Sequence, residues 1–118
     1  MTDAPVDDAV TMKPLPEAIR DLQAKRNMTR TDLWTAAEVG PGVLGRYLKT
    51  DRGRIMNSQV METVEKLAHA LGVAPEHFLE YRVEKGRRLV EDGIRQGLIG
   101  LEDIELIIER QRFLSQKD

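Results

Sequence analysis

The chain has 118 residues, enough for one compact domain with a small appendage but not for two full-sized domains. Hydrophobic residues make up 41% and charged residues 32%, a balance typical of a folded soluble chain, and the absence of cysteine excludes disulfides, thiolate metal sites and cysteine nucleophiles. The net charge of −2 argues only weakly against a nucleic-acid partner, because the charge is unevenly distributed.

Residues 1–13 are predicted to form a flexible acidic leader. Its first twelve residues contain three acids and no base, which is unlike the basic start of a signal peptide. No run in the chain approaches the roughly 20 apolar residues that a membrane span requires. We therefore expect a cytoplasmic protein without membrane association.

Three short helices are predicted within residues 14–49. Leu15, Ile19 and Leu22 recur at helical spacing, and this first helix should end near Asn27. The second helix should begin at Thr29 or Thr31, both good N-terminal caps. Residues 38–40 read as a tight turn, after which residue 41, a proline, suits the first position of a third helix.

Residues 50–57 lack apolar periodicity and are predicted to be a basic loop containing Arg52 and Arg54. Asn57 or Ser58 can cap the next helix, which Gly72 should end. Its residues show the clearest helical stripe in the chain, formed by Met61, Val64, Leu67, Ala68 and Leu71. A further short helix is expected to open at residues 74–76.

The remaining residues, 81–118, predict two more helices separated by Gly97 and Gly100. No alternating strand pattern occurs anywhere in the chain. The fold class is therefore expected to be all-α, with a leader at 1–13, a five-helix domain at 14–80 and a C-terminal helical pair at 81–118.

The segment 28–48 carries a family resemblance, as does the helix that follows it. The residues are Met28-Thr29-Arg30-Thr31-Asp32-Leu33, Ala37-Glu38-Val39-Gly40, Val43-Leu44-Gly45-Arg46-Tyr47-Leu48 and the run from Met61 to Val73. Over about residues 15–80 the chain resembles the Cro and lambda-repressor-like (XRE-type) helix-turn-helix family. The resemblance implies double-stranded DNA as the partner, with a recognition helix at about residues 41–49 lying in the major groove.

The charge distribution agrees with this interpretation, since residues 13–60 carry a net charge of +4 and residues 61–118 one of −3. The start of the second helix offers unpaired N–H groups and a partial positive charge to a phosphate. Arg46 is the best candidate for a base contact, because arginine pairs bidentately with guanine. The full set of candidate DNA contacts is Thr29, Arg30, Thr31, Gly40, Pro41, Gly42, Gly45, Arg46, Lys49, Arg52 and Arg54.

Two features depart from the family pattern. Glu38 stands where such turns usually have glycine, which either asks a non-glycine residue to make the turn or changes its shape. Residues 40–42 lack the polar side chains that usually touch base edges, so phosphate contacts are expected to outweigh base readout.

No enzymatic site is predicted. His69 and His77 are eight residues apart, which fits no common zinc pattern, and no phosphate-binding loop or catalytic triad is present. We therefore expect no cofactor and no metal.

The C-terminal helical pair carries more apolar surface than two helices can bury between themselves. Its candidate dimerisation residues are Val90, Ile94, Leu98, Leu101, Ile104, Ile107 and Ile108. They could pack on the five-helix unit or, as we favour, on a second copy of the chain. The predicted function is a dimeric transcriptional regulator, with repression as the default; the alternative is an antitoxin-like or adaptor module whose tail binds another polypeptide.

Overall fold

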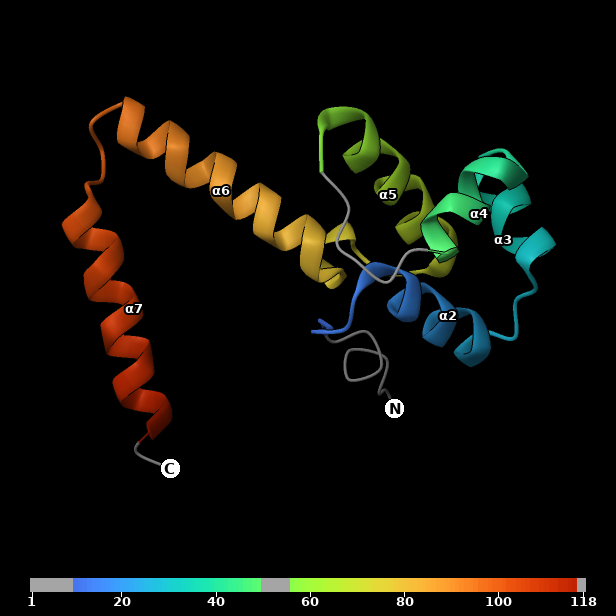
Figure 1. Cartoon of the computed structure of the whole chain (residues 1–118), viewed down its shortest axis with the longest axis horizontal. Helices are drawn as coiled ribbons and strands as arrows, with labels where there is room; N and C mark the ends of the chain where they lie inside the picture. Colours follow the sequence, from blue (N-terminus) through green and yellow to red (C-terminus); the bar gives the residue numbers. More distant parts are fainter. Residues whose placement is uncertain (1–9, 50–55, 117–118) are drawn as a thin grey trace. The chain divides into compact units, whose positions relative to one another are not determined.

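The computed structural model describes residues 10–49 and 56–116, and every regular element in these ranges is a helix (Figure 1). This confirms the all-α prediction. In chain order the elements are α2 (Leu15–Lys25), α3 (Arg30–Ala37), α4 (Pro41–Lys49), α5 (Ser58–Leu71), the 3-10 turn η1 (Pro75–His77), α6 (Leu79–Arg95) and α7 (Leu101–Gln116). Among the described residues, no helix combines the length and apolar character needed to cross a membrane.

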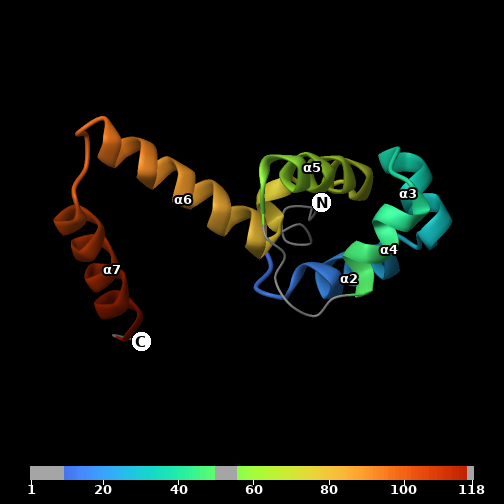
Figure 2. The same cartoon turned by 45° about the horizontal axis from the view of Figure 1, so that its top comes forward.

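The chain divides into two compact units, Met1–Glu84 and Lys85–Asp118, and the division falls within α6. The first unit holds the hydrophobic core. In it α3 packs against α5, and α2 packs against α4, as both views show (Figures 1 and 2). Each of these helices buries the stripe that its periodicity predicts, and Phe78 closes the core after η1. The fully buried large side chains of this core include Leu15, Ile19, Leu33, Leu44, Val64, Leu67, Leu71 and Phe78.

Local capping residues set the helix ends in the first unit. The Asn57 side-chain oxygen accepts a hydrogen bond from the Val60 N–H at 2.8 Å, which fixes the start of α5. Gly72 takes a left-handed conformation, with φ of 75°, directly after the last residue of α5. Asn27 does the same after α2. These are the residues at which the sequence predicts a helix to begin or end.

Hydrogen bonds tie residues 10–13, the described part of the expected leader, to the region after α5. The Thr11 N–H donates to the His77 carbonyl at 3.0 Å, and Arg82 donates to the Thr11 carbonyl at 2.9 Å. Arg82 also donates to the carbonyls of Glu76 and His77, at 3.0 and 2.8 Å. The short helix expected to begin at residues 74–76 is only the three-residue turn η1, and α6 begins two residues after it. Residues 10–13 are therefore attached to the first unit by these hydrogen bonds.

In the second unit, the connection between α6 and α7 is fixed by backbone hydrogen bonds. Gly97 is left-handed, with φ of 73°, and the Leu98 N–H donates to the Gly93 carbonyl at 2.9 Å. The Gly100 N–H donates to the Asp103 carboxylate at 2.8 Å, at the start of α7. Figures 1 and 2 show α7 turning away from α6 after this connection. Most of the surface of α7 is consequently not covered by α6.

Candidate nucleic-acid interface

The start of α3 is fixed by a reciprocal capping box. The Thr29 hydroxyl accepts from the Asp32 N–H at 3.0 Å, and the Asp32 carboxylate accepts from the Thr29 N–H at 2.9 Å. Hydrogen bonds to the Asp32 carboxyl, from the Thr29 backbone first and the Thr29 side chain second, hold its pKa below the ordinary value. The capping role of Asp32 was not among the predictions from sequence, although the spacing Thr-x-x-Asp is a signal for this motif.

The capping box changes what the helix end can offer to a phosphate. The N–H groups of Thr29 and Asp32 are used within the motif, so Arg30 and Thr31 carry the remaining donors of the first turn. The Asp32 carboxylate also offsets part of the positive dipole end. The predicted clamp of Thr29, Arg30 and Thr31 thus contains two suitable backbone donors and one guanidinium.

The turn between α3 and α4 keeps a shape that glycine normally supplies. Glu38 has φ of 59° and ψ of 40°, in the left-handed region. The Val39 N–H then donates to the Trp34 carbonyl at 3.1 Å. Of the two outcomes open from the sequence, the chain therefore takes the first: a non-glycine residue makes the turn and accepts the strain.

Because of this strain, Glu38→Gly is expected to raise the free energy of unfolding by about 1 kcal/mol. Urea unfolding followed by fluorescence of the single tryptophan, Trp34, would measure the change. Glu38→Ala is the control, since it removes the carboxylate but keeps Cβ. An equal gain in both variants would assign the effect to charge rather than to backbone conformation.

α4 has two unlike faces. Leu44, Tyr47 and Leu48 are buried in the core. Helical spacing places Gly42, Gly45 and Arg46 on the opposite side. Of these, Gly42 and Arg46 are exposed. Gly40 and Pro41, at the start of the helix, are exposed as well. The outward face of α4 therefore carries no large side chain among these residues except that of Arg46.

One arginine of α3 reaches across to this face. A Cβ atom built on Gly45 would lie 2.8 Å from Nη2 of Arg30. Gly45 is buried, while Arg30 itself is exposed. Arg30 and Arg46, two of the predicted contacts, are therefore both on the exposed side of this helix pair.

Several bases of the segment 13–60 have structural partners. Arg20 donates to the Leu48 carbonyl at the end of α4, and Arg26 donates to the Leu71 carbonyl at the end of α5. Lys13 binds the Asp21 carboxylate at 2.6 Å. The sequence-based net charge therefore overstates what the segment offers to a ligand. Arg52, Arg54 and the side chain of Lys49 lie outside the described residues.

The side of the first unit between α3 and α5 is acidic. A hollow there is lined by Ala36, Ala37, Glu38, Glu62, Glu65, Lys66 and His69. The Tyr81 hydroxyl donates to Glu65 at 2.6 Å, which positions one of these carboxylates. Three carboxylates against one lysine disfavour a phosphate at this side. Within the described ranges, no cluster of three histidine or acidic residues is arranged to hold a metal ion.

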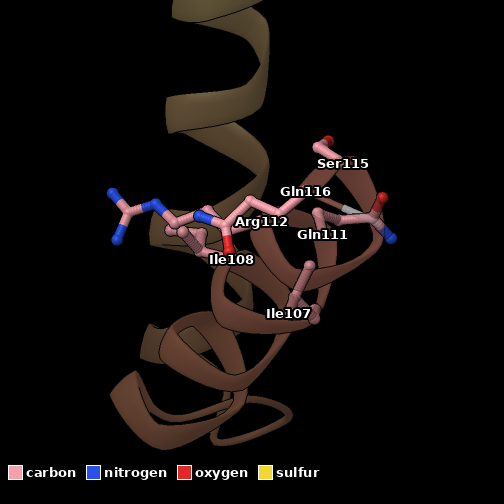
Figure 3. A pocket seen from close by; sticks show the side chains of 6 residues that line it. All are labelled: Ile107, Ile108, Gln111, Arg112, Ser115 and Gln116. Atoms are coloured by element: carbon pink, nitrogen blue, oxygen red, sulfur yellow. The ribbon is translucent and has the colours of Figure 1, made fainter. Parts of the chain in front are cut away.

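The second unit exposes most of its predicted dimerisation residues. Leu101 is 69% exposed and Ile107 60%, Val90 and Ile104 are half-buried, and α7 contains no buried residue. Figure 3 shows a shallow hollow on α7 that Ile107 and Ile108 line together with Gln111 and Arg112. Leu89 on α6 and Leu106 and Leu114 on α7 are exposed as well, and they were not among the predicted residues. For Leu106 and Leu114 a signal was present in the sequence, since α7 has apolar residues on more than one face.

Comparison with known protein families, curated proteins and solved structures found no match.

Proposed function

We propose that the protein binds double-stranded DNA through α4 and acts as a transcriptional regulator. In this proposal α3 and α4 form a helix-turn-helix of the Cro and lambda-repressor-like type, and α4 enters the major groove. The observation that carries the proposal is the two-faced character of α4. Its apolar side is held in the core, while Arg46 and a glycine-rich surface face outward.

Charge and rigidity support the same surface. Arg30 and Arg46 are exposed on the pair α3 and α4, whereas the hollow between α3 and α5 is acidic. A polyanion is therefore favoured at the outward face of α4. The capping box of α3 and the hydrogen bond from Arg20 to the end of α4 hold both helices in place. Such preorganisation lowers the entropic cost of binding.

Self-association through the C-terminal helices is the second part of the proposal. Burying one leucine or isoleucine side chain contributes about 1.5–3 kcal/mol, so four or five from each copy are enough to offset the cost of association. A two-fold dimer would place two copies of α4 on successive turns of the major groove.

Fluorescence anisotropy with labelled duplex DNA, measured at several salt concentrations, tests the proposal. The affinity of the wild-type protein should fall steeply as salt rises. Arg46→Ala should weaken binding about tenfold. Lys66→Ala removes an exposed cation beside Glu62 and Glu65 and should leave the affinity unchanged. Absence of binding by the wild-type protein at low salt would reject the proposal.

A second candidate function rests on the exposed apolar surface of α7. In this alternative, the antitoxin-like or adaptor module, the C-terminal helices bind a different polypeptide. A monomeric wild-type protein that does not bind DNA would favour it over the regulator.

A further inference from the structure

Arg30 and Gly45 come from different helices and meet at the outward side of α4. Gly45 lies on the same side of α4 as Gly42 and Arg46, yet its backbone is buried. Nη2 of Arg30 lies next to it and would be 2.8 Å from a Cβ at position 45. Real Cβ atoms essentially never approach a nitrogen so closely, so the guanidinium occupies space that any other residue at 45 would fill.

Nothing in the described part of the chain neutralises this guanidinium. Within residues 10–49 and 56–116 it forms no hydrogen bond and no ion pair. Asp32, two residues further along α3, directs its carboxylate to the Thr29 N–H instead. The Nη2 end of the Arg30 guanidinium thus lies beside α4, and its charge and N–H donors are available to an anion.

We infer that Gly45 is a positioning residue: it provides a seat for the Arg30 guanidinium, which then binds a phosphate group of the DNA beside α4. This inference rests on the proposed function and adds to it how one contact is built. The backbone N–H groups of Arg30 and Thr31 lie at the N-terminus of α3, where the dipole of the helix favours an anion. A phosphate is the anion that duplex DNA presents on both sides of the major groove.

Gly86, on α6, offers a matched control outside the proposed DNA-binding surface. A Cβ at Gly86 would have no atom within 4 Å, so alanine fits there without displacing any side chain. Alanine is the better helix former at both positions, so both variants should fold at least as stably as the wild-type protein. Only Gly45→Ala requires the end of Arg30, a flexible side chain, to move.

The experiment measures the affinity and the salt dependence of duplex DNA binding for five proteins: wild type, Gly86→Ala, Gly45→Ala, Arg30→Ala and the double variant Arg30→Ala/Gly45→Ala. Gly45→Ala and Arg30→Ala should each weaken binding about five- to tenfold, and each should lower the slope of log affinity against log salt by about 1. Gly86→Ala should change neither quantity by a measurable amount.

The double variant distinguishes an effect of Gly45→Ala on the position of Arg30 from a direct effect of the new methyl group on DNA. If Gly45 acts through Arg30, adding Gly45→Ala to Arg30→Ala should cause no further loss. If the methyl group instead collides with DNA, its cost should be equally large in both backgrounds, and the inference is wrong. Equal binding by wild type and Gly45→Ala would also overturn it. Failure of the wild-type protein to bind DNA would instead reject the proposed function, so the two failures are distinguishable.

Discussion

Arg82→Ala is expected to lower the free energy of unfolding of the first unit by about 2–4 kcal/mol, because several charge-assisted hydrogen bonds are lost together. The half-buried Arg82 guanidinium donates to the carbonyls of Thr11, Glu76 and His77, at distances of 2.8–3.0 Å. It therefore joins the segment before α2 to η1. Without it, the hydrogen bonds that the described residues keep near this junction are those of the Thr11 N–H to the His77 carbonyl and of the Leu15 N–H to the Glu80 carboxylate.

Urea unfolding followed by Trp34 fluorescence is the suitable measurement, because Trp34 packs against the core of the first unit. Arg95→Ala is a matched control on the same helix. Arg95 is 74% exposed and binds Glu91 at 3.0 Å, so its loss should cost less than about 1 kcal/mol. Equal midpoints for the two variants would show that the Arg82 hydrogen bonds contribute no more than a surface ion pair.

Arg82→Lys distinguishes charge from geometry. A lysine keeps the positive charge but cannot present the planar fork with which Arg82 reaches three carbonyls. We therefore expect Arg82→Lys to lose more than half as much free energy of unfolding as Arg82→Ala does. Faster hydrogen exchange at the Thr11 amide in both variants would locate the change at the connection to His77.

The parts of this fold that sequence predicts well are those set by neighbouring residues. Thr29, Asn57 and Gly72 act on the turn of helix next to them, so the sequence narrowed the start of α3 to Thr29 or Thr31 and that of α5 to Asn57 or Ser58, and it placed the end of α5 at Gly72. The buried stripe of α5 follows from helical periodicity in the same way. Because such signals are local, they survive without knowledge of the rest of the chain.

The roles of the long basic side chains could not be predicted in this way. Arg20, Arg26 and Arg82 donate to carbonyls that are 28, 45 and 71 residues away in the chain. No local pattern encodes such partners. A net charge computed from sequence also counts a base that binds a carbonyl at a helix end in the same way as a base that is available to a ligand. For the same reason, the sequence placed Arg30 and Gly45 among the candidate contacts without indicating that the two residues touch.

Ile107→Lys is expected to convert the proposed dimer into a monomer. Helical spacing places Leu101, Ile104, Ile107 and Ile108 on one side of α7, and the acidic Glu102 and Glu109 away from that side. A lysine within a buried apolar interface would lose its hydration without gaining a partner, which costs several kcal/mol. That is comparable with the whole contribution of two or three buried isoleucines at about 1.5–3 kcal/mol each.

Glu109→Gln is the matched control, since it raises the net charge of α7 by one, as Ile107→Lys does, but away from the apolar side. Light scattering over a range of concentrations should give twice the chain mass for wild type and Glu109→Gln, and one chain mass for Ile107→Lys. Because α7 buries none of its residues, the substitution should leave Trp34 fluorescence and the unfolding of the first unit unchanged. A wild-type protein that is monomeric throughout would contradict the dimer.

Loss of the dimer should also weaken DNA binding, since each monomer then engages the duplex with a single copy of α4. For Ile107→Lys the expected loss is larger than for Arg46→Ala, because linking two binding units raises the apparent affinity by about a hundredfold or more. The salt dependence should also decrease by about half, as half the phosphate contacts remain. If Ile107→Lys is monomeric yet binds a two-site duplex like the wild-type protein, DNA binding does not depend on self-association, and the apolar side of α7 then fits the adaptor alternative better.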